Sequence, residues 1–128
     1  MVRFMIPLAA AAALVSAPAI AGNAKAGDAK AGQALYKAKC AMCHGDTAKS
    51  PAGLGPRLFG VAGRKAGTLP GYTYSPAMVA SGLVWKADKL KLYLANPQGV
   101  VRGNKMPMAP ITAAADRDNI VAYLVTLR

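Results

Sequence analysis

Residues 40–44 read Cys-Ala-Met-Cys-His, and this pentad constrains the fold and chemistry of the chain more than any other feature. Two cysteines separated by two residues and followed directly by a histidine are typical of covalent haem attachment, in which both thiols form thioethers to the porphyrin and the imidazole binds the iron. The chain has two cysteines and one histidine in total, all within this pentad. The pattern predicts one haem c on Cys40 and Cys43, with His44 as an axial ligand.

Two other uses of the cysteine pair fit the sequence less well. A thioredoxin-like redox dithiol is expected near a βαβ pattern, which this chain lacks. A structural zinc ion normally takes four Cys or His ligands, and the sequence offers three. A disulfide is possible in an oxidising compartment, but the adjacent histidine favours haem.

The N-terminal residues are typical of a secretory signal. Arg3 supplies the positive charge, residues 4–15 form an apolar stretch, and residues 19–21 (Ala-Ile-Ala) match the cleavage pattern. A retained membrane anchor is the alternative, weakened because prolines interrupt the segment and alanine dominates it. We therefore expect residues 1–21 to be cleaved, and residues 22–128 to form one soluble domain in the periplasm.

The composition is strongly basic. Sixteen Lys and Arg residues face five acids, which gives a formal net charge of +11. Such a surface favours an acidic protein partner or an anionic membrane face. Nucleic acid is not expected as a partner, because the lysines are scattered and lack the interleaved aromatic residues of a single-strand binder.

Helix signals lie at both ends of the predicted domain. The first helix is expected over about 28–40, with Asp28 as its N-cap, and the last begins at about 112 or 113 and ends at Leu127. Gly32 in the first helix costs about 1 kcal/mol relative to alanine, so we expect another backbone to approach closely there.

Shorter helices and loops are expected between the terminal helices. Ser75 can cap a helix that begins at Pro76 and ends at Gly82. A second helix is expected over 86–95, stopped by the Asn-Pro pair that follows. Residues 45–74 are rich in Gly and Pro and predict a loop, and no strand pair is evident, so the fold class is all-α.

The ligand on the second face of the iron determines the chemistry. A methionine thioether there favours ferrous iron and raises the potential, whereas an open position allows ligand binding or peroxide chemistry. The methionines of the predicted domain are Met42, Met78, Met106 and Met108, and Met42 is too close to His44 to reach the opposite face. Spacing alone does not choose between Met106 and Met108, and both are also compatible with a role as core gap-fillers.

Several motifs in one register resemble the class I cytochromes c, in the branch of mitochondrial cytochrome c and its soluble bacterial relatives. The resemblance covers nearly all of residues 27–127. It includes GPRLFG at 55–60, PGYTY at 70–74, Trp85, YLANP at 93–97, GNKM at 103–106 and IVAYL at 120–124. It implies a small all-α fold in which three main helices, short helices and loops surround one covalently bound haem.

The resemblance also implies roles around the iron. Met106, rather than Met108, matches the axial methionine. The Pro56 carbonyl would accept a hydrogen bond from the His44 ring, and the Tyr93 hydroxyl would donate toward the Met106 sulfur.

Other matched residues are implied to bind the rest of the haem or to pack the helices. Tyr74 and Trp85 would donate to a buried propionate, with the Arg64 charge close to it. Tyr36 and Tyr123 would be core aromatics where the terminal helices cross, with Gly32 and Ile120 beside them.

Three positions depart from the family pattern. Asn104 stands where a propionate-bonding threonine is usual, Met78 replaces an asparagine, and Met108 replaces an aromatic residue at the haem edge. The docking ring of lysines keeps Lys39 and Lys105. Other ring positions hold Gln98, Gly99, Thr112 and Ala113.

The function implied is one-electron transport, not enzyme catalysis. Expected partners are redox proteins with acidic docking surfaces, namely a quinol–cytochrome c reductase, a terminal oxidase, or a periplasmic dehydrogenase or reductase. We expect a monomer that docks transiently at membrane complexes and does not bind nucleic acid. The alternative is a ligand-binding or peroxidase-like haem protein with an open axial site.

Overall fold

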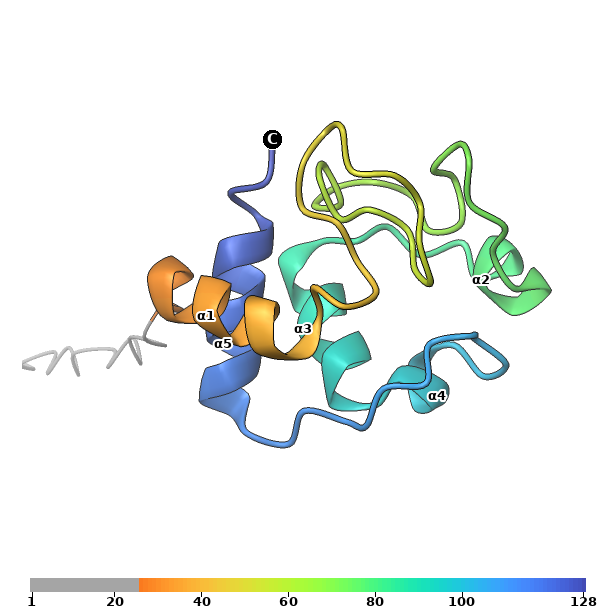
Figure 1. Cartoon of the computed structure of the whole chain (residues 1–128). Helices are drawn as coiled ribbons and strands as arrows, with labels where there is room; N and C mark the ends of the chain where they lie inside the picture. The colour runs from red at the N-terminus through yellow and green to blue at the C-terminus, as the bar shows by residue number, and fades with distance from the viewer. Residues whose placement is uncertain (1–25) are drawn as a thin grey trace, which may run out of the picture.

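The computed structural model describes residues 26–128, so the predicted signal at 1–21 lies outside the described residues. Within them the element order is α1 (Ala29–Lys39), α2 (Pro76–Ala80), α3 (Ala87–Ala95), α4 (Pro97–Val100) and α5 (Ala114–Leu124) (Figure 1). The described part of the chain contains no strand, only an isolated antiparallel bridge between Lys65 and Val84. The predicted all-α class is confirmed.

Helices α1 and α5 cross and form the centre of the fold (Figure 1). At the crossing, a Cβ on Gly32 would lie 1.8 Å from the Asn119 carbonyl oxygen, so only glycine fits. Tyr36 and Ile120 are the largest fully buried side chains, at 1% and 0% exposure. The close approach predicted at Gly32 is confirmed.

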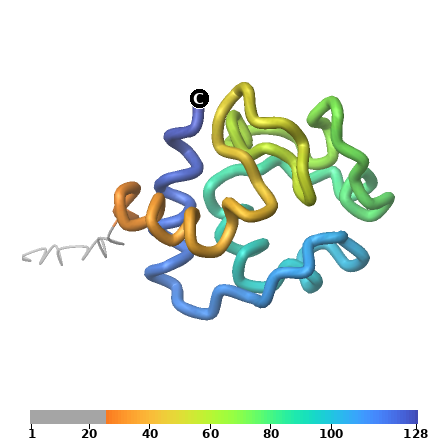
Figure 2. Tube along the Cα trace, viewed as in Figure 1, coloured from red at the N-terminus to blue at the C-terminus, as the bar shows by residue number. Residues whose placement is uncertain are grey.

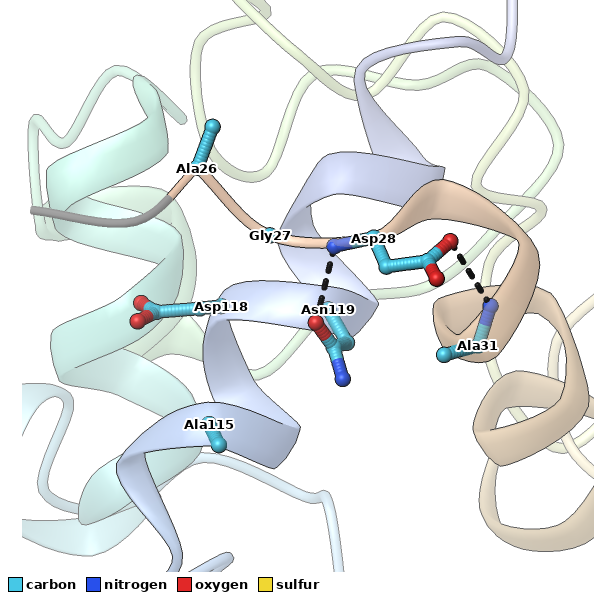
Figure 3. A pocket seen from close by; sticks show the side chains of 7 residues that line it. All are labelled: Ala26, Gly27, Asp28, Ala31, Ala115, Asp118 and Asn119. Atoms are coloured by element: carbon cyan, nitrogen blue, oxygen red, sulfur yellow. Dashed lines mark hydrogen bonds between the residues drawn. The ribbon is translucent and has the colours of Figure 1, made fainter.

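A small pocket lies beside this crossing, where α1 begins (Figure 3). The Asp28 carboxylate accepts hydrogen bonds from the N–H groups of Lys30 and Ala31, as predicted for an N-cap, and the Asp28 N–H donates to Asn119 Oδ1 at 2.8 Å. A Cβ on Gly27 would lie 2.0 Å from the Asp118 carbonyl oxygen. A second close contact, which the sequence did not predict, therefore fixes the start of α1 against α5.

Helix α5 ends at Leu124, three residues before the predicted end at Leu127. The N–H groups of Thr126 and Leu127 bond to carbonyls three residues back, at 2.9 and 3.2 Å, so the last turn tightens and the α-helix stops. The Gly60 N–H also donates to the Leu127 carbonyl at 2.7 Å. Leu127 still lies in the core with Ile120 and the rest of its apolar stripe.

The two predicted central helices are present, and an additional short helix follows them. The Ser75 side chain accepts from the Met78 N–H and caps α2. Helix α3 ends before Asn96, as expected, but Asn96 also caps α4 by accepting from the Gly99 N–H at 2.9 Å. The Asn-Pro pair that stops one helix therefore starts another, because Pro97 suits the first position of a helix.

Two irregular segments complete the fold (Figure 2). Residues 45–74 form the predicted loop, yellow to green in the figure, and residues 101–113, in blue, lead into α5. The two segments meet where the Lys105 ammonium donates to the Thr73 carbonyl. No helix among residues 26–128 is long and apolar enough to cross a membrane.

Candidate functional site

The attachment pentad leaves α1 as a continuation of its last turn. The Cys40 N–H donates to the Tyr36 carbonyl at 2.8 Å, and the N–H groups of Cys43 and His44 donate to the Cys40 carbonyl at 3.0 and 2.9 Å. These bonds place the two thiols and the imidazole on one compact turn.

The two thiols do not resemble a reactive dithiol. Cys40 and Cys43 are not joined by a disulfide. Burial raises the pKa of the Cys40 thiol to about 11, with the charge of Lys39 opposing the shift. Redox dithiols have lowered thiol pKa values, so this environment does not favour the redox-dithiol alternative. Nor does any group of three or more Cys, His, Asp or Glu side chains gather to hold a metal ion within residues 26–128.

The His44 ring is fixed in one orientation. Its Nδ1 lies 2.6 Å from the Pro56 carbonyl oxygen, so Nδ1 carries the proton and donates, and the Nε2 lone pair is left for a metal. A Cβ on Gly55 would lie 2.6 Å from the ring Cε1, so the imidazole packs directly on the glycine backbone. Burial lowers the pKa of His44, and the Pro56 hydrogen bond opposes that shift.

Two tyrosines from the terminal helices hold the pentad from behind. The Tyr36 hydroxyl donates to the His44 carbonyl at 2.6 Å, and the Tyr123 hydroxyl donates to Asp46 Oδ2 at 2.7 Å. Their ring centroids are 5.3 Å apart. The sequence predicted both as core aromatics; in the structure both also fix the segment that carries His44, and the role of Asp46 was not predicted.

The polar residues implied to bind the haem periphery lie close together. Trp85 and Tyr93 are 7% and 8% exposed, with ring centroids 5.0 Å apart. The Trp85 N–H donates to the Arg64 carbonyl at 2.9 Å. Burial raises the pKa of Tyr93 to about 12, with a contribution from Tyr72, so its hydroxyl remains a donor at neutral pH.

Arg64 is held by main-chain carbonyls beside Tyr74. Its Nη1 and Nη2 donate to the carbonyls of Phe59 and Arg57 at 3.2 and 3.3 Å. Burial lowers the pKa of Arg64, while the neighbouring Tyr74 opposes the shift and Arg57 adds to it. The guanidinium is therefore a partly buried cation with a fixed position, which suits a nearby anionic group.

The methionines differ in exposure. Met42 is 90% exposed. Met78, Met106 and Met108 are half-buried and pack against the core, so burial does not separate Met106 from Met108. The Met106 N–H donates to Asn104 Oδ1 at 2.8 Å, a contact that the sequence did not predict.

Comparison with known proteins identifies the family. The cytochrome c family model matches residues 29–128. The chain belongs to the cytochrome c family. Cytochrome c2 iso-2 of Magnetospirillum fulvum is 47% identical over 88 residues, which are 69% of this chain and 91% of that protein. Cytochrome c of Euglena viridis is 42% identical over 94 residues, 73% of this chain and 91% of that protein.

A solved structure shows the same fold in this family. Cytochrome cH from Methylobacterium extorquens has a TM-score of 0.73 and 42% sequence identity, and the match covers 78% of this chain and 99% of that chain. The resemblance to class I cytochromes c is thereby confirmed. This cytochrome c is a haem-based electron carrier with one haem c, covalently bound through Cys40 and Cys43.

The described residues fit that cofactor. Cys40 and Cys43 supply the two thiols, His44 presents a free Nε2, and the glycine at position 55 leaves room for the imidazole ring. When bound, haem iron supplies a one-electron couple between its ferrous and ferric states.

Proposed function

We propose that this cytochrome c is an exported, soluble, periplasmic one-electron carrier whose iron is bound by His44 and Met106. The observation that carries the proposal is the 2.6 Å contact between His44 Nδ1 and the Pro56 carbonyl, which leaves Nε2 as the metal-binding nitrogen. A protein carbonyl that orients a ligating histidine and raises its basicity is characteristic of built metal sites.

The remaining residues of the site keep the charge change small in structural cost. The His44 imidazole and the Met106 thioether stay bound in both oxidation states, and the soft thioether favours the ferrous state. The Tyr93 hydroxyl donates toward the Met106 sulfur. Arg64, Tyr74 and Trp85 offset the cost of burying a propionate by supplying a cation and hydrogen-bond donors.

The proposed location and partners follow from the ends and the charge of the chain. The signal-like residues 1–21 support export to the periplasm. The net charge of +11 supports transient docking on acidic surfaces, such as those of a quinol–cytochrome c reductase, a terminal oxidase, or a periplasmic dehydrogenase or reductase. Lys39 and Lys105 are exposed and available for such contacts.

Visible absorption of Met106→Ala and Met108→Ala holoproteins tests the ligand assignment. We expect Met106→Ala to lose the weak sulfur-to-ferric-iron band, to lower the reduction potential and to bind carbon monoxide rapidly, because the soft axial ligand is gone. Met108→Ala is the matched control and should keep the band.

Two results would contradict the proposal. Loss of the band in Met108→Ala but not in Met106→Ala would assign the ligand to Met108. Rapid carbon monoxide binding by the native ferrous protein would instead support the ligand-binding alternative with an open axial site.

A further inference from the structure

Asn104 is buried, and all three hydrogen-bonding positions of its side chain are used. It is 8% exposed. Its Nδ2 donates to the carbonyls of Pro97 and Val101 at 3.0 and 2.8 Å, and its Oδ1 accepts from the Met106 N–H at 2.8 Å. One amide therefore joins α4 and the residue after it to the backbone of Met106.

Gln98 on α4 holds the main chain of the same segment. Its Nε2 donates to the Asn104 carbonyl at 3.1 Å, and its Oε1 accepts from the Gly103 N–H at 3.2 Å. Gly103 has φ +89°, a left-handed conformation that favours glycine and turns the chain back toward α4. Two side-chain amides thus fix both sides of the turn.

Regular structure does not hold the segment around Met106. Between Asn104 and Ile111 no main-chain N–H donates to a main-chain carbonyl of a described residue, and Pro107 and Pro110 have no N–H to donate. Ile111 is the next residue so bonded, to the Leu94 carbonyl at 2.9 Å. The Asn104 side chain is therefore the main restraint on the backbone of Met106.

We propose that Asn104 is a positioning residue that fixes the Met106 backbone on α4 and so keeps the thioether on the iron, with Gln98 in support. The inference rests on the proposed His44/Met106 ligation. The resemblance implied a propionate-bonding side chain at this position, but both N–H groups of Asn104 Nδ2 are directed at carbonyls of its own segment. Asn104 acts through Met106 and does not need to touch the haem.

Imidazole titration of the ferric holoproteins tests the inference, since imidazole binds only when the Met106 thioether leaves the iron. We expect Asn104→Ala to bind imidazole about tenfold more tightly than wild type, the order of effect given by loss of a buried hydrogen bond. Gln98→Ala, whose bonds lie at the partly exposed edge of the network, should shift the affinity in the same direction by less.

Asn96→Ala is the matched control. Asn96 caps α4 through Gly99 but makes no hydrogen bond to Asn104 or Met106, so its loss destabilises the same short helix without releasing the methionine. Equal imidazole affinities in Asn104→Ala, Gln98→Ala and wild type, or equal shifts in Asn96→Ala and Asn104→Ala, would overturn the inference. If Asn104→Ala does not fold, the comparison of Gln98→Ala with Asn96→Ala decides.

The wild-type ferric spectrum separates this inference from the proposed function. Absence of the sulfur-to-iron band in wild type would contradict Met106 ligation itself. A normal wild-type band together with unchanged imidazole affinity in the variants would contradict only the positioning role of Asn104.

Discussion

The two sides of the proposed iron site are built differently. On the His44 side, the ligand follows directly from α1, its turn is closed by main-chain hydrogen bonds, and its carbonyl is tied to the buried Tyr36. On the Met106 side, the ligand lies in an irregular segment whose backbone is held by the side chain of Asn104. Segments with few main-chain hydrogen bonds open more easily, so ligand exchange should take place on the Met106 side.

The largest expected effect is on the His44 side, at the helix crossing that supports it. Gly32→Ala would place a Cβ 1.8 Å from the Asn119 carbonyl oxygen, so α1 and α5 would have to separate. We expect a loss of about 3 kcal/mol or more in the free energy of unfolding, measured by guanidinium denaturation of the holoprotein. Gly53→Ala is the control, because its Cβ would meet only the Cys43 carbonyl oxygen, at 3.7 Å. Similar stability of the two variants would show that the crossing is not the support we infer.

A smaller effect is expected when a single bond to the His44 backbone is removed. Tyr36→Phe deletes the hydroxyl that donates to the His44 carbonyl at 2.6 Å and leaves that acceptor without its partner. We expect a loss of about 1.5 kcal/mol on denaturation with little change in imidazole affinity, because the Met106 side is untouched. Tyr72→Phe, which loses an exposed bond of 3.3 Å to the Leu54 carbonyl, should cost less than about 0.5 kcal/mol. A marked rise in imidazole affinity in Tyr36→Phe would show that the two sides are not independent.

The smallest effect is expected at Lys105, which is next to Met106 but bonds at the surface. Its ammonium donates to the Thr73 carbonyl and lies 5.3 Å from the centre of the Tyr72 ring. Because both contacts are exposed, we expect Lys105→Ala to lose about 0.5 kcal/mol of stability and to change imidazole affinity less than Asn104→Ala does. Thermal denaturation and the same titration measure the two quantities. An effect as large as that of Asn104→Ala would place the restraint on Met106 in the contact between loops instead.

The sequence predicted the His44 side more completely than the Met106 side. The pentad, the Asp28 cap and the glycine at position 32 are local or steric signals, and each has one structural outcome. The double role of Asn96, the early end of α5 and the contact of Tyr123 with Asp46 depend on partners that are distant in sequence or on competition between hydrogen bonds. No local pattern encodes them.

The sequence by itself determined the family, the all-α fold class and the covalent haem c on Cys40 and Cys43, because these follow from residue types at fixed spacing. It also marked Asn104 as a departure from the family pattern without showing what the side chain does. Only the tertiary structure showed that this amide bonds α4 and Met106 together, and that Tyr36 holds the His44 carbonyl. The physical reason is that a hydrogen bond depends on where folding places the donor and the acceptor, and that placement is set by the packing of the whole chain.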